Sequence, residues 1–390
     1  MKIKLTSLRQ YLLSHCSALV LCVGLLPAAY AEVLSVGPGK QFISPAVAAT
    51  FAVDGDIVEI DGSGIYQGDV AIWKQNNLII RGINGRPHLQ AAGKSAGQKG
   101  IWVIKGNNVL VENVEFSGAK VPDKNGAGIR LEGTHLTIRN CYFHHNENGI
   151  LSGKDKESII LIEHSEFQEN GAGDGQSHNI YIGAIKELVL RFNTFRGAKI
   201  GHNVKSRAAR NIIKYNIIRD GANGTASYQV DLSNGGYSVL VGNSIQQGQY
   251  AENYSLIAYG MEGLKNSDNR LYMANNTLVN DRHNGVFVKT AKGSEAWLYN
   301  NLFVGKGKML EGPAQASFNL ATESPGFVAR MRGDYRLTAD SPSIDKGSAE
   351  VLSGENDLLP RYLPSKDLPL LTRDIQGALD IGAYEFRVLD

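Results

Sequence analysis

The segment Leu136-Thr-Ile-Arg-Asn140-Cys-Tyr-Phe143 alternates apolar and polar residues up to an asparagine and closes on an aromatic side chain. Related segments recur along the chain, and they close on Phe116, Phe167, Phe195, Ile218, Ile245, Leu278 and Phe303. Successive copies lie 23 to 33 residues apart, a period typical of solenoids. Because the alternation has a period of two, each coil is predicted to consist of strands rather than helices.

An asparagine marks the corner of nearly every copy. The corner residues are Asn113, Asn140, Asn193, Asn216, Asn243, Asn275 and Asn300, with His164 in the equivalent place. Asparagine tolerates a left-handed backbone, and its amide can hydrogen-bond to the same residue of the neighbouring coil. We therefore expect a structural ladder at this corner rather than a catalytic role for these asparagines.

A second series of short strands runs between the copies. Its members are Gly128–Leu131, Gly149–Ser152, Asn179–Ile182, Asn203–Ser206, Gln229–Leu232 and Gly285–Val288. Their inward positions are apolar, whereas their outward positions differ from coil to coil. Stacking these strands would produce a long shallow groove with varied side chains, and we expect the functional surface there.

Both ends of such a stack need cover, because open strand edges recruit other chains. The alanine-rich residues 43–53 are predicted to form a short N-terminal capping helix. The repeat stops after Phe303, and an irregular segment follows. We expect one all-β solenoid domain over residues 32–312, with residues 313–390 as an irregular C-terminal cap of the same domain.

The first residues have the pattern of a secretory signal peptide. Basic residues precede the apolar run Cys16–Leu26, and the small-residue site Ala29-Tyr30-Ala31 follows it. The apolar run is too short to span a bilayer, which disfavours a membrane anchor. The sequence predicts that residues 1–31 are removed and that the product is secreted or periplasmic, without a membrane contact.

Charge and cysteine content limit the partners of the mature chain. Removal of the signal segment takes away three basic and no acidic residues, so the formal net charge changes from +2 to −1 (+2 − 3). A basic stripe for nucleic acid is therefore not expected. Cys141 is the only cysteine outside the signal segment, and in a strand it is predicted to be a small buried hydrophobe. We expect a monomer that is stabilised by its core instead of disulfides.

The end segments resemble those of a known superfamily. Val36–Phe42 followed by Gly55–Glu59 is similar to the N-terminal coil of the exported right-handed β-helix repeat proteins of bacteria. Asp334–Leu337, Ser341–Asp345 and Asp380–Glu385 look like their C-terminal segment. This superfamily includes pectate lyases, alginate lyases and chondroitinase B. The resemblance implies a right-handed parallel β-helix over nearly the whole mature chain.

One turn resembles the alginate lyase and chondroitinase B group more specifically. Val204-Lys205-Ser206, followed by Asn211–Asn216, is similar to the turn that holds the catalytic lysine of that group. The resemblance implies that Lys205 is the base of a β-elimination on an acidic, uronate-containing polysaccharide. The chain departs from the group at Ile200, where a calcium-binding acid is expected, and at Asp231–Asn234, where an arginine is expected. Calcium therefore stays an open expectation, and no other cofactor is predicted.

The residue types around Lys205 suit elimination, which needs a base, a group that neutralises the uronate carboxylate and a proton donor. Lys205 would share one face with Tyr181 and Asp231, since neighbouring coils lie about 4.8 Å apart. Arg207 could lower the pKa of the lysine and hold the carboxylate. The catalytic candidates are Lys205, Arg207, His202, His178, Asp231 and Tyr181. Candidate substrate-binding residues are Asn179, Asn203, Tyr228, Gln229, Asn234, Tyr259, Glu262 and Arg130.

Other functions stay open at this point. A glycoside hydrolase would need Asp231 and a second carboxylate, either Asp174 or Glu262. A C5-epimerase would use the same lysine, and a polysaccharide-binding or matrix protein would need no base. No metal site is predicted, because the neighbours His144 and His145 should face opposite sides of a strand.

Overall fold

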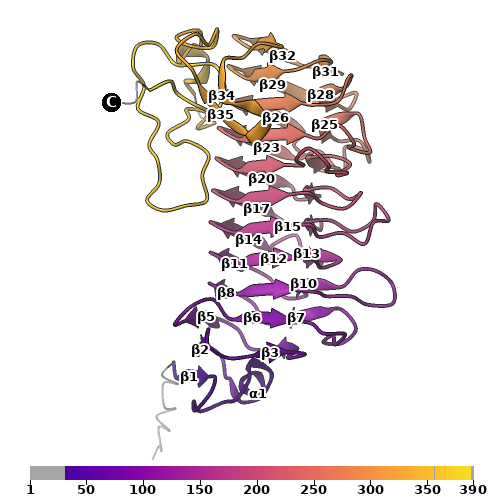
Figure 1. Ribbon diagram of the computed structural model, residues 1–390. Coiled ribbons are helices and arrows are strands. Elements are labelled where there is room, and N and C mark those ends of the chain that lie inside the picture. The colour runs from indigo at the N-terminus through magenta and orange to yellow at the C-terminus, as the bar shows by residue number, and fades with distance from the viewer. Residues whose placement is uncertain (1–30, 355, 388–390) are drawn as a thin grey trace, which may run out of the picture. The chain divides into compact units, whose positions relative to one another are not determined.

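The computed structural model describes residues 31–354 and 356–387, so most of the predicted signal peptide lies outside the described residues. Three parallel sheets run the length of the stack, and the chain visits sheets A, B and C in turn on each coil (Figure 1). Equivalent strands of successive coils pair in parallel and in register. The predicted all-β solenoid is confirmed.

Each predicted copy forms one strand of sheet A, a corner and one strand of sheet B. Sheet A consists of β1 (Val33–Val36), β2 (Ile57–Asp61), β5 (Ile79–Ile83), β8 (Val109–Glu112), β11 (Leu136–Arg139), β14 (Ile159–Glu163), β17 (Glu187–Arg191), β20 (Arg210–Lys214), β23 (Tyr237–Val241), β26 (Arg270–Ala274), β29 (Glu295–Tyr299) and β32 (Gln315–Ser317). Sheet B consists of β3 (Tyr66–Gln67), β6 (His88–Gln90), β9 (Glu115–Ser117), β12 (Tyr142–His144), β15 (Glu166–Gln168), β18 (Thr194–Arg196), β21 (Ile217–Arg219), β24 (Ser244–Gln247), β27 (Thr277–Asn280), β30 (Leu302–Val304) and β33 (Leu320–Thr322).

The second predicted strand series forms sheet C. It consists of β4 (Ala71–Trp73), β7 (Gly100–Ile104), β10 (Ala127–Leu131), β13 (Asn148–Ser152), β16 (Ile180–Ile182), β19 (Val204–Ser206), β22 (Val230–Leu232), β25 (Ser255–Tyr259), β28 (Val286–Thr290) and β31 (Lys308–Glu311). Strands β32 and β33 extend the coils past residue 312, although the irregular C-terminal cap was expected to begin at residue 313.

The interior of the stack is filled by columns of identical residue types. Phe116, Phe143, Phe167 and Phe195 stack face to face, with ring centroids 4.8 to 5.0 Å apart. All four rings are fully buried. The closing aromatic residue of each copy is therefore a core residue, and its repetition in the sequence follows from the coil spacing.

The asparagine corner contains two rows rather than one. Asn113, Asn140, Asn275 and Asn300 hold the left-handed backbone position, with φ between 48° and 56°. The continuous buried ladder lies at the next residue of each coil, where each side-chain Oδ1 accepts hydrogen bonds from the preceding coil. Its buried members are Asn193, Asn216, Asn243, Asn276 and Asn301, and the half-buried Asn319 ends it. The expectation of one row merged these two positions, since both carry asparagine.

Cys141 occupies the ladder position of its coil and is buried, as predicted. Its backbone N–H donates to Ser165 Oγ at 3.1 Å, which continues the ladder toward Asn193. Burial raises the pKa of the thiol to about 12. The thiol is therefore protonated at neutral pH and is a poor nucleophile.

The N-terminal helix α1 (Pro45–Phe51) lies within the predicted segment. Ser44 caps it, and its side chain accepts a hydrogen bond from the Val47 N–H at 3.4 Å. Ala48 and Ala49 are buried against the first coils. Proline at the first helical position and small residues on the inner face suit a short helix that covers the end of the stack.

The C-terminal segment packs along the sides of the last coils. It contains the antiparallel pair β34 (Phe327–Ala329) and β35 (Asp334–Leu337) and the 3-10 helices η1 (Arg330–Arg332) and η2 (Glu350–Leu352). Tyr335 and Ile381 join an apolar cluster on sheet B, and Leu352 joins another on sheet A. The segment also reaches back far enough for His164 Nδ1 to contact the carbonyl oxygen of Lys366 at 3.0 Å. Figure 1 shows this irregular chain beside the stack.

No helix among the described residues is long and apolar enough to cross a membrane.

Asp220, which follows β21, predicts a pH dependence of stability. Its carboxyl group is buried, and Oδ2 has no hydrogen-bond partner among the described residues. Burial raises the pKa of Asp220 from 3.8 to about 7. Between these two values the unfolded chain has lost the proton that the folded chain keeps, so stability should fall as the pH rises through this window.

Asp220→Asn should remove this loss. We expect the free energy of unfolding of the variant, relative to that of the parent, to increase by up to about 4 kcal/mol as the pH rises from about 4 to about 8. Urea unfolding at both pH values measures the gain. An equal difference between the two proteins at both pH values would contradict the prediction.

Candidate functional site

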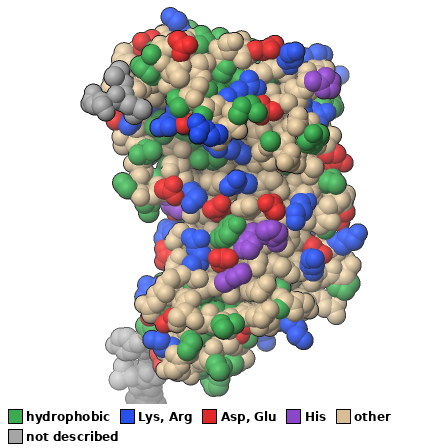
Figure 2. Space-filling view, viewed as in Figure 1, with side chains coloured by type: hydrophobic (Ala, Val, Ile, Leu, Met, Phe, Trp, Pro, Cys, Tyr) green, Lys and Arg blue, Asp and Glu red, His purple; other side chains and the backbone are tan. Residues whose placement is uncertain are grey.

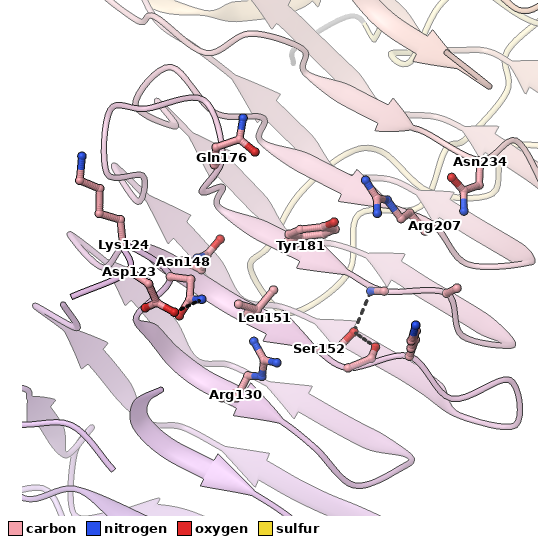
Figure 3. A pocket seen from close by; sticks show the side chains of 15 residues that line it. Asp123, Lys124, Arg130, Asn148, Leu151, Ser152, Gln176, Tyr181, Arg207 and Asn234 are labelled. Atoms are coloured by element: carbon pink, nitrogen blue, oxygen red, sulfur yellow. Dashed lines mark hydrogen bonds between the residues drawn. The ribbon is translucent and has the colours of Figure 1, made fainter. Parts of the chain in front are cut away.

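One outward column on sheet C gathers three of the six predicted catalytic residues, Tyr181, Lys205 and Asp231. Pairing aligns Arg130 with Leu151, Leu151 with Tyr181, Tyr181 with Lys205 and Lys205 with Asp231. This is the predicted register for the last three residues. Figure 3 shows Arg130, Leu151 and Tyr181 on successive strands with their side chains in the same groove. Strand alternation places one side chain per coil in this column.

Lys205 is the central group of the column. Its side chain is 8% exposed, and its Nζ donates to Asp231 Oδ2 at 2.9 Å and to Glu262 Oε1 at 2.7 Å. Ser233 Oγ donates to the same Asp231 oxygen at 2.6 Å. Asp231 Oδ1 is buried and has no hydrogen-bond partner among the described residues. One buried ammonium group is thus held between two carboxylates.

This arrangement determines the charge of the lysine. Burial alone would lower the pKa of Lys205, but Asp231 and Glu262 outweigh it, and the pKa is raised above its ordinary value. Burial likewise acts to raise the pKa of Glu262, but the hydrogen bond and charge of Lys205 lower it overall. In the free protein, Lys205 is therefore a cation at neutral pH.

Glu262 reaches the column from a turn two coils beyond Lys205. The turn follows β25, and its backbone requires positive φ values of 75° at Gly260 and 99° at Gly263. The Glu262 N–H donates to the Ser233 carbonyl oxygen at 3.0 Å, which folds the turn back over the groove. Arg207 pairs with the second Glu262 oxygen, and its guanidinium carbon lies 5.3 Å from the Tyr181 ring centroid.

His178 and His202 form a buried stack beside this column. Their ring centroids are 4.6 Å apart, and the Nδ1 atom of each ring accepts a backbone N–H, from His202 and Tyr228 respectively. Burial lowers the pKa of His202 to about 4 and that of His178 well below its ordinary value. Both rings are therefore neutral with the proton on Nε2. His202 Nε2 lies 3.5 Å from Asp231 Oδ2, so only His202 approaches the charged cluster.

Four of the residues predicted to bind substrate do not face the groove. Asn179, Asn203 and Gln229 are fully buried and hydrogen-bond to one another at 2.6 and 2.7 Å in a second internal ladder. Each precedes its sheet C strand at the corner, where the alternation of the strand does not extend. Tyr259 points into the core, and its hydroxyl donates to the Gly236 carbonyl oxygen at 2.8 Å. All four side chains are buried in the interior and cannot contact a polymer in the groove, so the expectation that they bind substrate is wrong.

The groove itself begins at Tyr181 and Arg207, next to Lys205, and extends toward β10. A cavity of about 520 Å³ lies there, and Arg130, Tyr181, Arg207 and Asn234 line it. Tyr228 is half-buried near His202, outside this cavity. Asp174 accepts hydrogen bonds from Gln176 and Ser177 within its own turn and does not approach Asp231.

Several lining residues were not predicted. Lys124 and Lys154 come from the loops that follow β9 and β13, and Ser152 ends β13. Figure 3 shows Lys124 on the rim opposite Arg207. A lysine in a variable loop carries no sequence signal of its own, and only the stacking of the coils brings these loops to one groove. The result is a cavity with four basic side chains, from Lys124, Arg130, Lys154 and Arg207, and one acidic side chain, from Asp123.

Comparisons with known proteins agree with this architecture. A family model described as a right handed beta helix region matches residues 63–171. The crystal structure of pectate lyase Pel9A superposes with a TM-score of 0.61 at 14% identity, covering 91% of this chain and 96% of the lyase. This protein is a right-handed parallel β-helix. An alginate lyase from Paenibacillus sp. str. FPU-7 gives a TM-score of 0.41 at 12% identity, over 74% of this chain and 99% of that one.

The β-helix also shares sequence with a curated protein. It is 29% identical over 164 residues to the tail spike protein of Salmonella phage epsilon15, which is 38% of this chain and 14% of the tail spike. The chain thus spans a small part of that relative's length. The family model and the pectate lyase superposition establish the fold of the β-helix, whereas its chemistry has to be argued from the side chains.

The calcium site of the lyases that the Lys205 turn resembles does not fit this β-helix. The carboxylates nearest to Lys205 are Asp231 and Glu262, and both are paired with the lysine itself. Ile200 takes the place of the expected acid. Among the described residues, the three-ligand cluster that could hold a metal lies elsewhere, at His88, Glu115 and His144. No step below is derived through calcium.

Proposed function

We propose that this β-helix binds an acidic polysaccharide along sheet C and cleaves it by β-elimination, with Lys205 as the base. The observation that carries the proposal is the buried Lys205 ammonium group beside Tyr181, which lines a groove with four basic side chains and one acidic side chain. Basic side chains complement the carboxylates of a uronate polymer. Secretion through residues 1–31 and a monomeric state are part of the same proposal.

The proposed reaction breaks two bonds and forms one double bond. Arg207 or Arg130 pairs with the uronate carboxylate and stabilises the negative charge that develops beside it. Neutral Lys205 takes the C5 proton, and the electron pair forms the C4–C5 double bond as the C4–oxygen bond breaks. Tyr181, whose ring lies 5.7 Å from Lys205 Nζ, is placed to protonate the leaving oxygen.

The two carboxylates predict a pH dependence of the reaction rate that can be measured. Because they raise the pKa of Lys205, the neutral base forms only under alkaline conditions, and kcat/KM should rise with pH. Glu262→Gln removes one negative charge and should lower the lysine pKa. We expect the rising limb of the pH profile to move to lower pH by about 1 unit, with faster cleavage at neutral pH.

A matched variant separates this effect from general damage to the groove. Glu311→Gln removes the carboxylate that pairs with Lys289, a residue of the same column two coils beyond Asp231. Its pH profile should be unchanged. An unchanged profile for Glu262→Gln would argue against Lys205 as the titrating base.

The assay for the function itself follows the absorbance of unsaturated uronates while the purified protein meets a panel of acidic polysaccharides. Elimination predicts a rise with at least one polymer. New reducing ends without that absorbance would point to hydrolysis, and tight binding without either product would point to a polysaccharide-binding protein.

Hydrolysis is the second candidate because Asp231 and Glu262 contact the same ammonium group. Their oxygens therefore lie on the order of 5 Å apart, the carboxyl spacing of retaining glycosidases. Lys205 lies between them, however, and lowers the pKa of Glu262, so Glu262 is not suited to act as the acid. The geometry therefore favours elimination.

A further inference from the structure

A cluster of imidazole and carboxylate groups lies on the outer face of sheet B, away from the Lys205 column on sheet C. His88, Glu115 and His144 come from β6, β9 and β12, which are neighbours in the sheet. Figure 2 shows histidine side chains gathered on this face with acidic side chains beside them. The cluster plays no part in the proposed elimination.

The three ligand atoms converge on one point. Glu115 Oε1 lies 3.0 Å from His144 Nε2 and 3.5 Å from His88 Nε2, and all three atoms lie within 4.8 Å of one another. A tetrahedral zinc ion with bonds of about 2.0–2.1 Å requires ligand atoms on the order of 3.3 Å apart. Small side-chain rotations would therefore place the three atoms around one ion. Ser117 Oγ, 2.7 Å from His88 Nε2, adds an oxygen at the edge of the cluster.

A second set of contacts orients His144. Its Nδ1 lies 2.8 Å from His145 Nδ1, and His145 Nε2 lies 3.2 Å from Glu169 Oε2. The two histidines thus form a chain between Glu169 and Glu115. Histidine ligands of metals usually have such a partner on the second ring nitrogen, because it sets the tautomer and the ring orientation.

We propose that His88 Nε2, Glu115 Oε1 and His144 Nε2 bind one divalent transition-metal ion of the zinc class. Two imidazoles and one carboxylate form a ligand set used by zinc sites that keep a fourth position for water. The ion would cross-link three successive coils, because its ligands come from β6, β9 and β12. Binding should therefore raise the thermal stability of the β-helix.

The proposal is tested on the purified chain without a histidine tag, first stripped with a chelator and then titrated with Zn²⁺ in a calorimeter and with Co²⁺ in a spectrophotometer. We expect one ion per chain, visible absorption bands of four-coordinate Co²⁺ and a higher melting temperature. His88→Ala and His144→Ala should each weaken binding by at least about 100-fold.

Two further variants keep the test independent of folding. Glu115→Gln preserves the shape of the side chain and should weaken binding, while circular dichroism stays that of the parent. His283→Ala removes an exposed histidine outside the cluster and should bind like the parent. Absence of stoichiometric binding by the parent would overturn the proposal, and so would His88→Ala and His144→Ala variants that bind the ion as tightly as the parent. Loss of the site would leave the elimination on sheet C untouched, so the two proposals fail separately.

Discussion

Lys205→Met is expected to lower kcat/KM for polysaccharide cleavage by about 100- to 10,000-fold, the contribution of a positioned general base. Methionine keeps the length and much of the apolar contact of the lysine but cannot accept a proton. The measurement is the initial rate of unsaturated product formed from the best polymer of the panel. Activity within tenfold of the parent would rule out Lys205 as the base.

The control is Lys289→Met. Lys289 projects from the same column of sheet C and pairs with Glu311 at 2.7 Å, so its loss reports the general effect of removing a paired lysine from this face. We expect activity near that of the parent.

Stability has to be separated from catalysis in this comparison. Lys205→Met leaves the buried Asp231 carboxylate without its counter-charge, which typically costs about 3–5 kcal/mol. Lys205→Met/Asp231→Asn removes both charges and should recover most of the stability without recovering activity. A folded but inactive double variant would assign the loss to the chemistry.

Asn243→Ala is expected to give the largest loss of stability among the variants of the fold. Asn243 is fully buried, and its Nδ2 donates to the Ile213 carbonyl oxygen at 2.8 Å and to Asn276 Oδ1 at 2.9 Å. Its Oδ1 accepts from the backbone N–H and the Nδ2 of Asn216. Alanine would leave these buried groups without partners, at about 1–3 kcal/mol each. Urea unfolding should show a loss of several kcal/mol.

The comparison variant is Asn140→Gly in the outer asparagine row. Asn140 has a φ of 48° and exposed hydrogen bonds, and glycine adopts that backbone without strain. We expect less than about 1 kcal/mol of change, since water replaces exposed partners. Equal losses for the two variants would contradict the division of the corner into a buried ladder and an outer row.

The sequence was sufficient wherever the relevant pattern is local. Strand alternation within Asn203–Ser206 and its neighbours predicted that Tyr181, Lys205 and Asp231 share a column, and the pairing of β16, β19 and β22 agrees. The same rule failed for Asn179, Asn203 and Gln229, because they stand at the corner, where the chain turns and the side chain points inward. Alternation holds only as far as the strand does.

Contacts between coils were beyond the reach of the sequence. Nothing near Lys205 in the chain indicates that Glu262 will be its partner, since the two meet only because a turn two coils away folds back. His88, Glu115 and His144 are 27 to 56 residues apart and carry no recognisable spacing. Glu115 and His144 do not even occupy paired positions in their strands.

Repetition and alternation, which the chain carries in its order of residues, were thus enough to determine the coils, the two predicted strand series and the outward position of Lys205. The tertiary structure alone decided the charge state of that lysine, the basic groove beside it and the imidazole cluster on sheet B. The physical reason is that a coil of 23 to 33 residues can vary in length without changing its strands. The same alternation is therefore compatible with many different sets of neighbours, and the stacking of the coils selects one of them.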